Sequence, residues 1–203
     1  MPGAPNRPPE GAGAPVAPPA AEPARAVLRR LAPSRIALSL DPWKGAPSTE
    51  LLDPLDTAAR LFGEGDFDGA TSALDQLSVR LAEPRWPTLP RPFRDLRVAV
   101  PVPQPPSWDP ENALGPEEKT ARRRRRDAEL QRDLARASLA WAKGHGHRVD
   151  DLEPDLAHAE GALGAPGVPE EFWPAIDRIW ATLTERVPAP RRAARAGGAP
   201  GPT

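Results

Sequence analysis

The chain has 203 residues, of which 39% are hydrophobic, and a formal net charge of -1 at pH 7. This length suits one small domain with tails, and this apolar content cannot bury the whole chain. Because the sequence contains no cysteine, disulfides, thiolate metal sites and cysteine nucleophiles are excluded. We find no signal-peptide pattern and no run of eighteen apolar residues, so we expect a cytoplasmic protein without a membrane-spanning helix.

The two ends of the chain differ in composition from its middle. Residues 1–25 contain eight Pro, seven Ala and three Gly, and residues 188–203 lead through a few Arg into a similar mixture. Ordering such segments would lose backbone entropy and bury almost no apolar surface. We therefore predict two disordered tails around a helical domain of residues 26–187.

The first part of this domain carries two apolar stripes at helical spacing. The first predicted helix has Asp53 as N-cap and Pro54 as its first residue, with Ser48 as an alternative start. Its apolar positions are Leu55, Ala58, Ala59 and Phe62. The second predicted helix begins after the N-cap Asp66. Its stripe consists of Ala70, Leu74, Leu77 and Leu81. Because the connection is short, residues 48–83 predict an antiparallel helical hairpin.

Part of this hairpin resembles a tetratricopeptide repeat. The residues that carry the resemblance are Gly65, Asp66, Phe67 and Ala70, in the order G-D-F-x-x-A, with Ala58 and Leu61 in the first helix. It covers residues 51–83 and departs from the family pattern at Thr57 and Leu77. The resemblance implies two closely packed helices, because Gly allows the turn and a small Ala allows close approach.

A Pro-rich segment, residues 84–115, follows the hairpin. Nine Pro fall between residues 84 and 110, which favours a stiff, extended spacer. Two short segments, one near the start of the domain and one inside the Pro-rich segment, have apolar residues at alternate positions, a pattern typical of strands. They are Ile36, Leu38 and Leu40, and later Leu96, Val98, Val100 and Val102. We predict a short two-stranded β-ribbon from residues 35–40 and 96–102.

Three further helices are predicted between residues 116 and 187. The first runs from Pro116 to Gly144, the second from Asp151 to Leu163, and the third from about Glu170 to Val187. The last has the clearest apolar face: Trp173, Ile176, Ile179, Trp180, Leu183 and Val187. The chain is therefore predicted to be mainly α-helical, with about five helices in two hairpins joined by the spacer.

A run of five cations is the most conspicuous charged feature. It consists of Arg122, Arg123, Arg124, Arg125 and Arg126. One interpretation is contact with the phosphates of a nucleic acid. Another is a solvated helix start, with i, i+4 ion pairs from Glu118 and Glu129. A third is internal docking against the acidic residues 50–83. The lack of an accompanying aromatic or Gly-rich motif favours the last two.

Three tryptophans lie beside prolines in connecting segments. Trp43, Trp86 and Trp108 are candidates for exposed aromatic contacts with a base or a Pro-rich ligand. The alternative, which the burial tendency of aromatics favours, is that they clamp loops onto helices. Trp141, Trp173 and Trp180 lie on apolar stripes and are assigned to the core.

His145 and His147 are the strongest metal-ligand candidates, with His158 nearby. Flanking glycines leave them without the fixed second shell that a metal site needs, so we predict no metal and no cofactor. No nucleophile, oxyanion donor or nucleotide-binding motif accompanies them, and no catalytic residue is assigned.

These features favour a non-enzymatic helical interaction or scaffold module that binds a protein partner. The alternative is a nucleic-acid-binding accessory protein that uses the basic run Arg122–Arg126. An enzyme is the third and least supported hypothesis.

Overall fold

The computed structural model describes residues 22–40, 43, 48–99, 115–164 and 167–190. Their α-helices are α1 (Glu22–Ala37), α2 (Thr49–Glu64), α3 (Phe67–Leu81), α4 (Pro116–Gly144), α5 (Glu153–Ala162) and α6 (Phe172–Arg186). Two short 3₁₀ helices are η2 (Phe93–Ala99) and η4 (Asp150–Leu152). The predicted mainly helical fold is confirmed. Across the described ranges, no helix has the length and apolar character needed to cross a bilayer.

Two expectations about the first half of the chain are wrong. The tail predicted to reach residue 25 overlaps α1, which begins at Glu22; residues 1–21 and 191–203 lie outside the described residues. The predicted β-ribbon is replaced by helical structure, because Ile36 belongs to α1 and Leu96 to η2. Residues 100–102 of the ribbon are not among the described residues. The alternating pattern was too short to decide between strand and helix. Packing decided it instead: α1 packs against α2, α3, α4 and α6, and η2 packs against α1 and α3.

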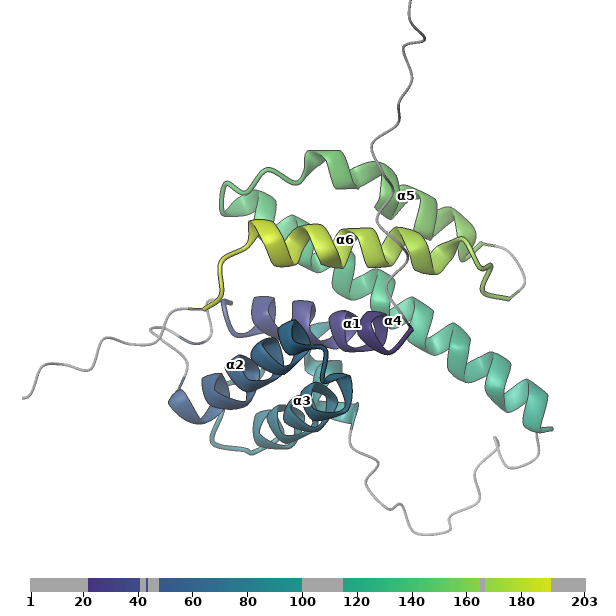
Figure 1. Ribbon diagram of the computed structural model, residues 1–203. Helices are drawn as coiled ribbons and strands as arrows, with labels where there is room; N and C mark the ends of the chain where they lie inside the picture. The colour runs from purple at the N-terminus through teal and green to yellow at the C-terminus, as the bar shows by residue number, and fades with distance from the viewer. Residues whose placement is uncertain (1–21, 41–42, 44–47, 100–114, 165–166, 191–203) are drawn as a thin grey trace, which may run out of the picture.

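Helix α1 lies at the centre of the fold. It packs on α2 and α3 on one side and on α4 and α6 on the other. Figure 1 shows this arrangement, with the α2–α3 hairpin below α1, α6 above it, and α4 crossing behind. Val27, Leu31 and Ile36 are almost completely buried in these contacts. The helix that connects the two groups of helices is therefore the one that the sequence pattern did not predict.

A proline inside α1 explains part of its packing. Pro33 has no N–H, so the carbonyl of Arg29, four residues earlier, loses its intrahelical partner. The side-chain amide of Gln131, in α4, donates a hydrogen bond to this carbonyl at 3.3 Å. The other end of the same amide accepts a hydrogen bond from the indole N–H of Trp180, in α6, at 2.9 Å. One buried glutamine thus joins α1, α4 and α6.

Helix α2 repeats this arrangement. Pro54 lies inside the helix, so the carbonyl of Glu50 has no intrahelical partner, and Arg80 of α3 donates a hydrogen bond to it. Ser48 is the N-cap of α2, which confirms the alternative start and corrects the start at Asp53. Pro54 can therefore lie in the interior of α2 and not only in its first turn, because Arg80 of α3 satisfies the carbonyl of Glu50 that the proline leaves free.

The turn of the α2–α3 hairpin follows the predicted residues. Gly65 ends α2 with φ 80°, a conformation that favours glycine. The carboxylate of Asp66 then caps α3 by accepting a hydrogen bond from the backbone N–H of Gly69 at 2.9 Å. Ala70 is fully buried where the two helices meet. The predicted antiparallel hairpin is confirmed.

The last three helices lie close to their predicted bounds. Helix α4 begins at Pro116 and ends at Gly144, as expected. The 3₁₀ turn η4 precedes α5, so the regular helix begins two residues later than predicted. The apolar face of α6, including the fully buried Ile176 and Trp180, packs against α1, α4 and α5. Arg35 of α1 donates hydrogen bonds to the carbonyls of Thr184 and Val187 and so caps the end of α6.

Candidate functional site

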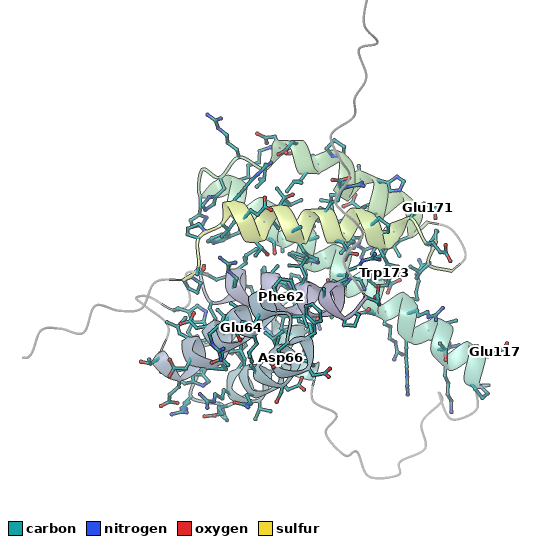
Figure 2. All side chains as sticks on the ribbon, in the orientation of Figure 1. Phe62, Glu64, Asp66, Glu117, Glu171 and Trp173 are labelled. Atoms are coloured by element: carbon teal, nitrogen blue, oxygen red, sulfur yellow. The ribbon has the colours of Figure 1, made fainter. Side chains whose placement is uncertain are left out.

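The two halves of α4 have different surroundings. From Ala128 to Gly144, seven residues are buried and face the core: Ala128, Gln131, Leu134, Ala135, Ser138, Leu139 and Ala142. From Pro116 to Asp127, no residue is buried. We call residues 116–127 the arm. Figure 1 shows it extending beyond the other helices at the lower right. In Figure 2, Glu117 lies at its free end, far from the hairpin residues Phe62, Glu64 and Asp66.

The outward face of the arm is uniformly basic. Lys119, Arg122, Arg123 and Arg126 have the spacing i, i+3, i+4, i+7, which places them on one side of an α-helix. The three arginines are exposed and Lys119 is half-buried. We call these four residues the basic stripe. Arg123 has no hydrogen bond or ion pair with any of the described residues. The exposed pair between Arg122 and Glu118, at 3.3 Å, is of a kind that contributes only about 0.3 kcal/mol.

The other two arginines of the run lie on the sides of the arm nearer to residues 167–168, Arg125 half-buried and Arg124 exposed. Arg125 forms an ion pair with Glu129 at 2.8 Å and donates a hydrogen bond to the carbonyl of Gly167 at 3.3 Å. Arg124 lines a hollow of about 500 Å³ between the arm and residues 167–168. The predicted i, i+4 pairs at the helix start are therefore confirmed. The pairs Arg122–Glu118 and Arg125–Glu129 lie within α4, and neither involves the hairpin of residues 48–83.

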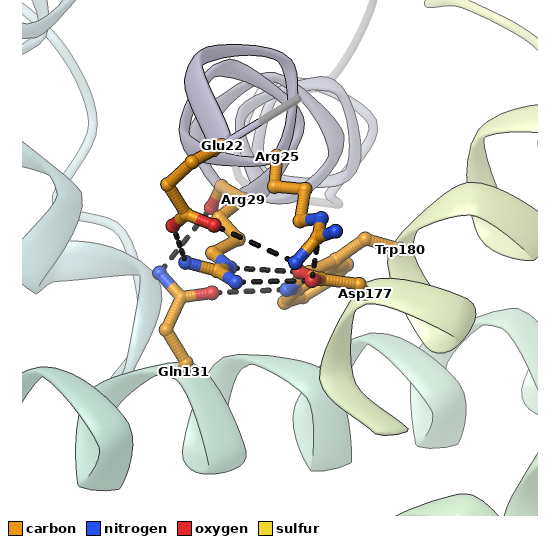
Figure 3. A network of polar contacts seen from close by, with 6 residues as sticks. All are labelled: Glu22, Arg25, Arg29, Gln131, Asp177 and Trp180. Atoms are coloured by element: carbon orange, nitrogen blue, oxygen red, sulfur yellow. Dashed lines mark hydrogen bonds and ion pairs between the residues drawn. The ribbon is translucent and has the colours of Figure 1, made fainter. Parts of the chain in front are cut away.

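A network of charged and polar side chains fixes the point where the arm leaves the core (Figure 3). Arg29 of α1 donates two hydrogen bonds to the carboxylate of Asp177, in α6, at 2.7 and 3.0 Å. Glu22 accepts a third from Arg29, at 3.1 Å, and Arg25 lies within ion-pair distance of both acids. The Arg29 guanidinium also lies over the ring of Trp173, 4.3 Å from its centre.

The electrostatics of Arg29 follow from these contacts. Burial lowers the pKa of its guanidinium, but the hydrogen bonds and charges of Asp177 and Glu22 outweigh this effect and raise the pKa above its ordinary value. Both partners are largely shielded from solvent, with 11% of the Arg29 side chain and 15% of the Asp177 side chain exposed. The pair therefore stays charged and holds α1 against α6, beside the base of the arm.

The three candidate aromatic contacts have different outcomes. Trp43 is buried, 9% exposed, and its indole N–H donates a hydrogen bond to the carbonyl of Ala37 at 2.8 Å, so it is not an exposed contact and agrees with the favoured interpretation of a loop clamp. Trp86 is half-buried; it lies 6.2 Å from Trp43 between ring centres and is covered by the guanidinium of Arg85. This pair clamps the connecting segments onto the helices, as the alternative interpretation predicted. Trp108 lies outside the described residues.

The histidines that were considered as metal ligands pack against an aromatic ring. His145 stacks on Trp141 with 4.4 Å between ring centres, and its Nδ1 lies 2.8 Å from the Trp141 carbonyl oxygen. His147 is 5.9 Å from the same ring. Over the described ranges, no three His, Asp or Glu side chains are grouped so that they could hold a metal ion.

Two features of this site were missed by the sequence analysis. The first is that Lys119 belongs to the basic stripe. The spacing of the four cations could have shown this, but attention fell on the five consecutive arginines. The contact between Arg29 and Asp177 gave no comparable signal, because 148 residues separate them and α1 was not predicted.

Comparison with known proteins finds no match: no family model, no curated protein and no solved structure is similar to the chain. The tetratricopeptide-like pattern of residues 51–83 therefore stays a prediction. The function has to be argued from the geometry of the arm and its surroundings.

Proposed function

We propose that the protein is a nucleic-acid-binding accessory protein and that the arm is its contact element. The observation that supports this proposal is the basic stripe on the outward face of a helix half that contains no buried residue. Within the stripe, Lys119 and Arg123, and likewise Arg122 and Arg126, are like charges at i, i+4, which destabilise a helix. A polyanion bound along this face would remove that repulsion. Binding of a polyanion therefore gains from the relief of these like-charge contacts.

The chemistry of the surface favours a nucleic acid over the protein partner that the sequence analysis preferred. Protein interfaces have an apolar core, rich in aromatic side chains. Among the described residues, Val79 in α3 is the exposed large hydrophobic side chain, 51% exposed, and it does not lie on the arm. Nucleic-acid interfaces are more polar and much more positively charged. The arm is polar, and four cations lie on its outward face.

Replacing all five arginines tests this function. Changing residues 122–126 from Arg to Gln should weaken binding to DNA or RNA at least about tenfold at about 50 mM salt, because each lost phosphate contact reduces the affinity. Changing the same five residues to Lys keeps the charge and should preserve most of the binding. The measurement is a fluorescence-anisotropy titration, with helicity checked by circular dichroism. A wild-type protein that binds neither DNA nor RNA at low salt would contradict the proposal.

A protein partner is the second candidate, and a different observation favours it. The inner face of the arm presents the small side chains of Thr120 and Ala121 to the hollow that Gly167 and Val168 line on the other side. A partner segment could dock there without displacing the basic stripe. Ala121→Phe would fill the hollow. If a protein partner binds there, this variant loses it and keeps its affinity for DNA; the reverse result favours the first candidate.

A further inference from the structure

We infer that the nucleic acid bound by the arm is double-stranded and that two of the five arginines in the run do not touch it. The contacts are assigned to the basic stripe, which includes Lys119 and three of the five arginines. Arg125, which contacts Glu129 and the carbonyl of Gly167, and Arg124, which lines the hollow beside Gly167, are assigned to the inner side of the arm, away from the nucleic acid. This inference rests on the proposed function and adds the form of the ligand and the residues that contact it.

The length of the stripe suits the charge density of a duplex. Lys119 and Arg126 are seven residues apart, which corresponds to about 10 Å along an α-helix. A duplex carries one phosphate charge per about 1.7 Å of its axis, so a segment of this length presents about six charges on its two strands. The four cations of the stripe are therefore matched by at least as many phosphate charges in an equal length of duplex.

The described residues lack the accessible aromatic rings of Phe and Trp on which binding of a single-stranded nucleic acid depends. Proteins that bind single strands stack the bases on accessible aromatic rings. No Phe or Trp side chain among the described residues is exposed, and the exposed ring of His145 is stacked on Trp141. Trp173, beside the base of the arm, already has the Arg29 guanidinium over its ring and the edge of Phe172 against it. The arm is therefore equipped to bind phosphates and not bases, so its binding should not depend on sequence.

The same stripe could meet the phosphates of lipid headgroups, and its composition distinguishes the two ligands. A helix that binds a bilayer surface inserts an apolar face between the acyl chains. The arm has no Leu, Ile, Val, Phe or Trp between Pro116 and Asp127. Attraction to a membrane would thus rest on charge alone, whereas a duplex presents a high density of phosphate charge over the length of the stripe.

The arginine run itself supplies a matched pair of variants. The double variant Arg122→Gln with Arg123→Gln removes two adjacent cations of the stripe and the ion pair with Glu118. The double variant Arg124→Gln with Arg125→Gln removes two adjacent cations outside the stripe and the ion pair with Glu129. The two proteins have the same composition and net charge. They differ in the face of the helix that is changed.

Salt dependence gives the number of contacts. For four phosphate contacts, the logarithm of the duplex association constant should fall against the logarithm of salt concentration with a slope of about -3.6. The Arg122/Arg123 variant should reduce the slope by about 1.8 and weaken binding about fiftyfold at about 0.1 M salt. The Arg124/Arg125 variant should stay within about twofold of wild type. Arg123→Gln alone, which breaks no contact among the described residues, should change the slope by about 0.9.

The titrations use the full chain with three probes: a DNA duplex of about 20 base pairs, either of its single strands, and vesicles of phosphatidylcholine with phosphatidylserine. We expect the duplex to bind most tightly. Equal losses in the two double variants, a single strand that binds as tightly as the duplex, or preferential binding to vesicles would each overturn the inference. The first two of these outcomes leave the proposed function intact. A wild-type protein that binds none of the nucleic acids would end both.

Discussion

The two halves of α4 belong to one continuous helix of 29 residues but are stabilised in different ways. The half from Ala128 to Gly144 packs against α1, α5 and α6, and Gln131 connects it to two of them. The arm, from Pro116 to Asp127, has a proline at its first position, acidic residues in its first turn and i, i+4 ion pairs, but no buried side chain. Each such ion pair stabilises a helix by only about 0.3 kcal/mol.

The difference separates the surfaces of α4 that packing explains from those that it does not. In the C-terminal half of α4, packing accounts for the buried residues. In the arm, no side chain of the outward face is buried, and the basic stripe places like charges at i, i+4. A charged surface that packing of the core does not require is best explained by a partner.

The largest expected effect concerns the tryptophan that anchors the core half. Trp180 of α6 is fully buried and donates its indole N–H to Gln131. Trp180→Ala should reduce the free energy of unfolding by about 3–5 kcal/mol, through the cavity and the lost hydrogen bond. Thr120→Ala, in the arm, should stay within about 0.5 kcal/mol of wild type. Urea denaturation measures both. Similar losses in the two variants would show that the arm is part of the cooperative core.

A smaller loss is expected when Gln131 itself is replaced. Gln131→Met keeps the length of the side chain but leaves the Arg29 carbonyl and the Trp180 N–H without a partner, which should cost about 2–4 kcal/mol. In a Pro33→Ala background, the restored backbone N–H can pair with the Arg29 carbonyl within α1. The same Gln131 change should then cost about 1 kcal/mol less. An equal cost in both backgrounds would contradict the role given to Pro33.

The sequence predicted the elements whose signals are local. The caps Ser48 and Asp66, the turn at Gly65 and the start of α4 at Pro116 depend on residues within a few positions of one another. The central helix α1 was missed for the opposite reason. Its internal Pro33 is tolerated because a glutamine 98 positions later satisfies the freed carbonyl, and no local pattern can show this. Tertiary contacts overrode the short alternating pattern that suggested a strand.

For the candidate site, the sequence indicated the run Arg122–Arg126 but did not show on which side of the helix each arginine lies. Five consecutive arginines look equivalent in a sequence. Only the direction of the core face of α4 shows that Arg124 and Arg125 lie on the sides nearer to residues 167–168 while Arg122 and Arg123 lie on the outward face. The tryptophans show the same limit, because a tryptophan next to a proline can be exposed or buried. Trp43 is buried because α1 offers it a carbonyl and an apolar surface, and α1 was not foreseen.

Two alanines in the same helix give a direct comparison of its halves. Ala135 is fully buried, so Ala135→Gly should cost about 1–2 kcal/mol, from helix propensity and the lost methyl group. Ala121 lies in the arm, so Ala121→Gly should change global stability by less than about 0.5 kcal/mol, because the arm can unfold without opening the core. Hydrogen exchange should nevertheless become faster for amides of the arm. Equal losses of global stability would mean that the two halves unfold together.

The smallest expected effect concerns an exposed ion pair beyond the packed end of α4. Two hydrogen bonds from Arg186 hold the pKa of the Asp151 carboxyl below its ordinary value. Because the pKa is lower in the folded state, the contribution to stability is present above the unfolded pKa, about 3.9, and is lost as pH falls through the folded value. Asp151→Asn should therefore melt slightly below wild type at pH 7, and the gap should close as pH falls below about 4. Thermal melts over this range measure the gap. Because both side chains face solvent, a gap as large as that of the Gln131 variant would show that exposed pairs contribute more here than the comparison of the two halves allows.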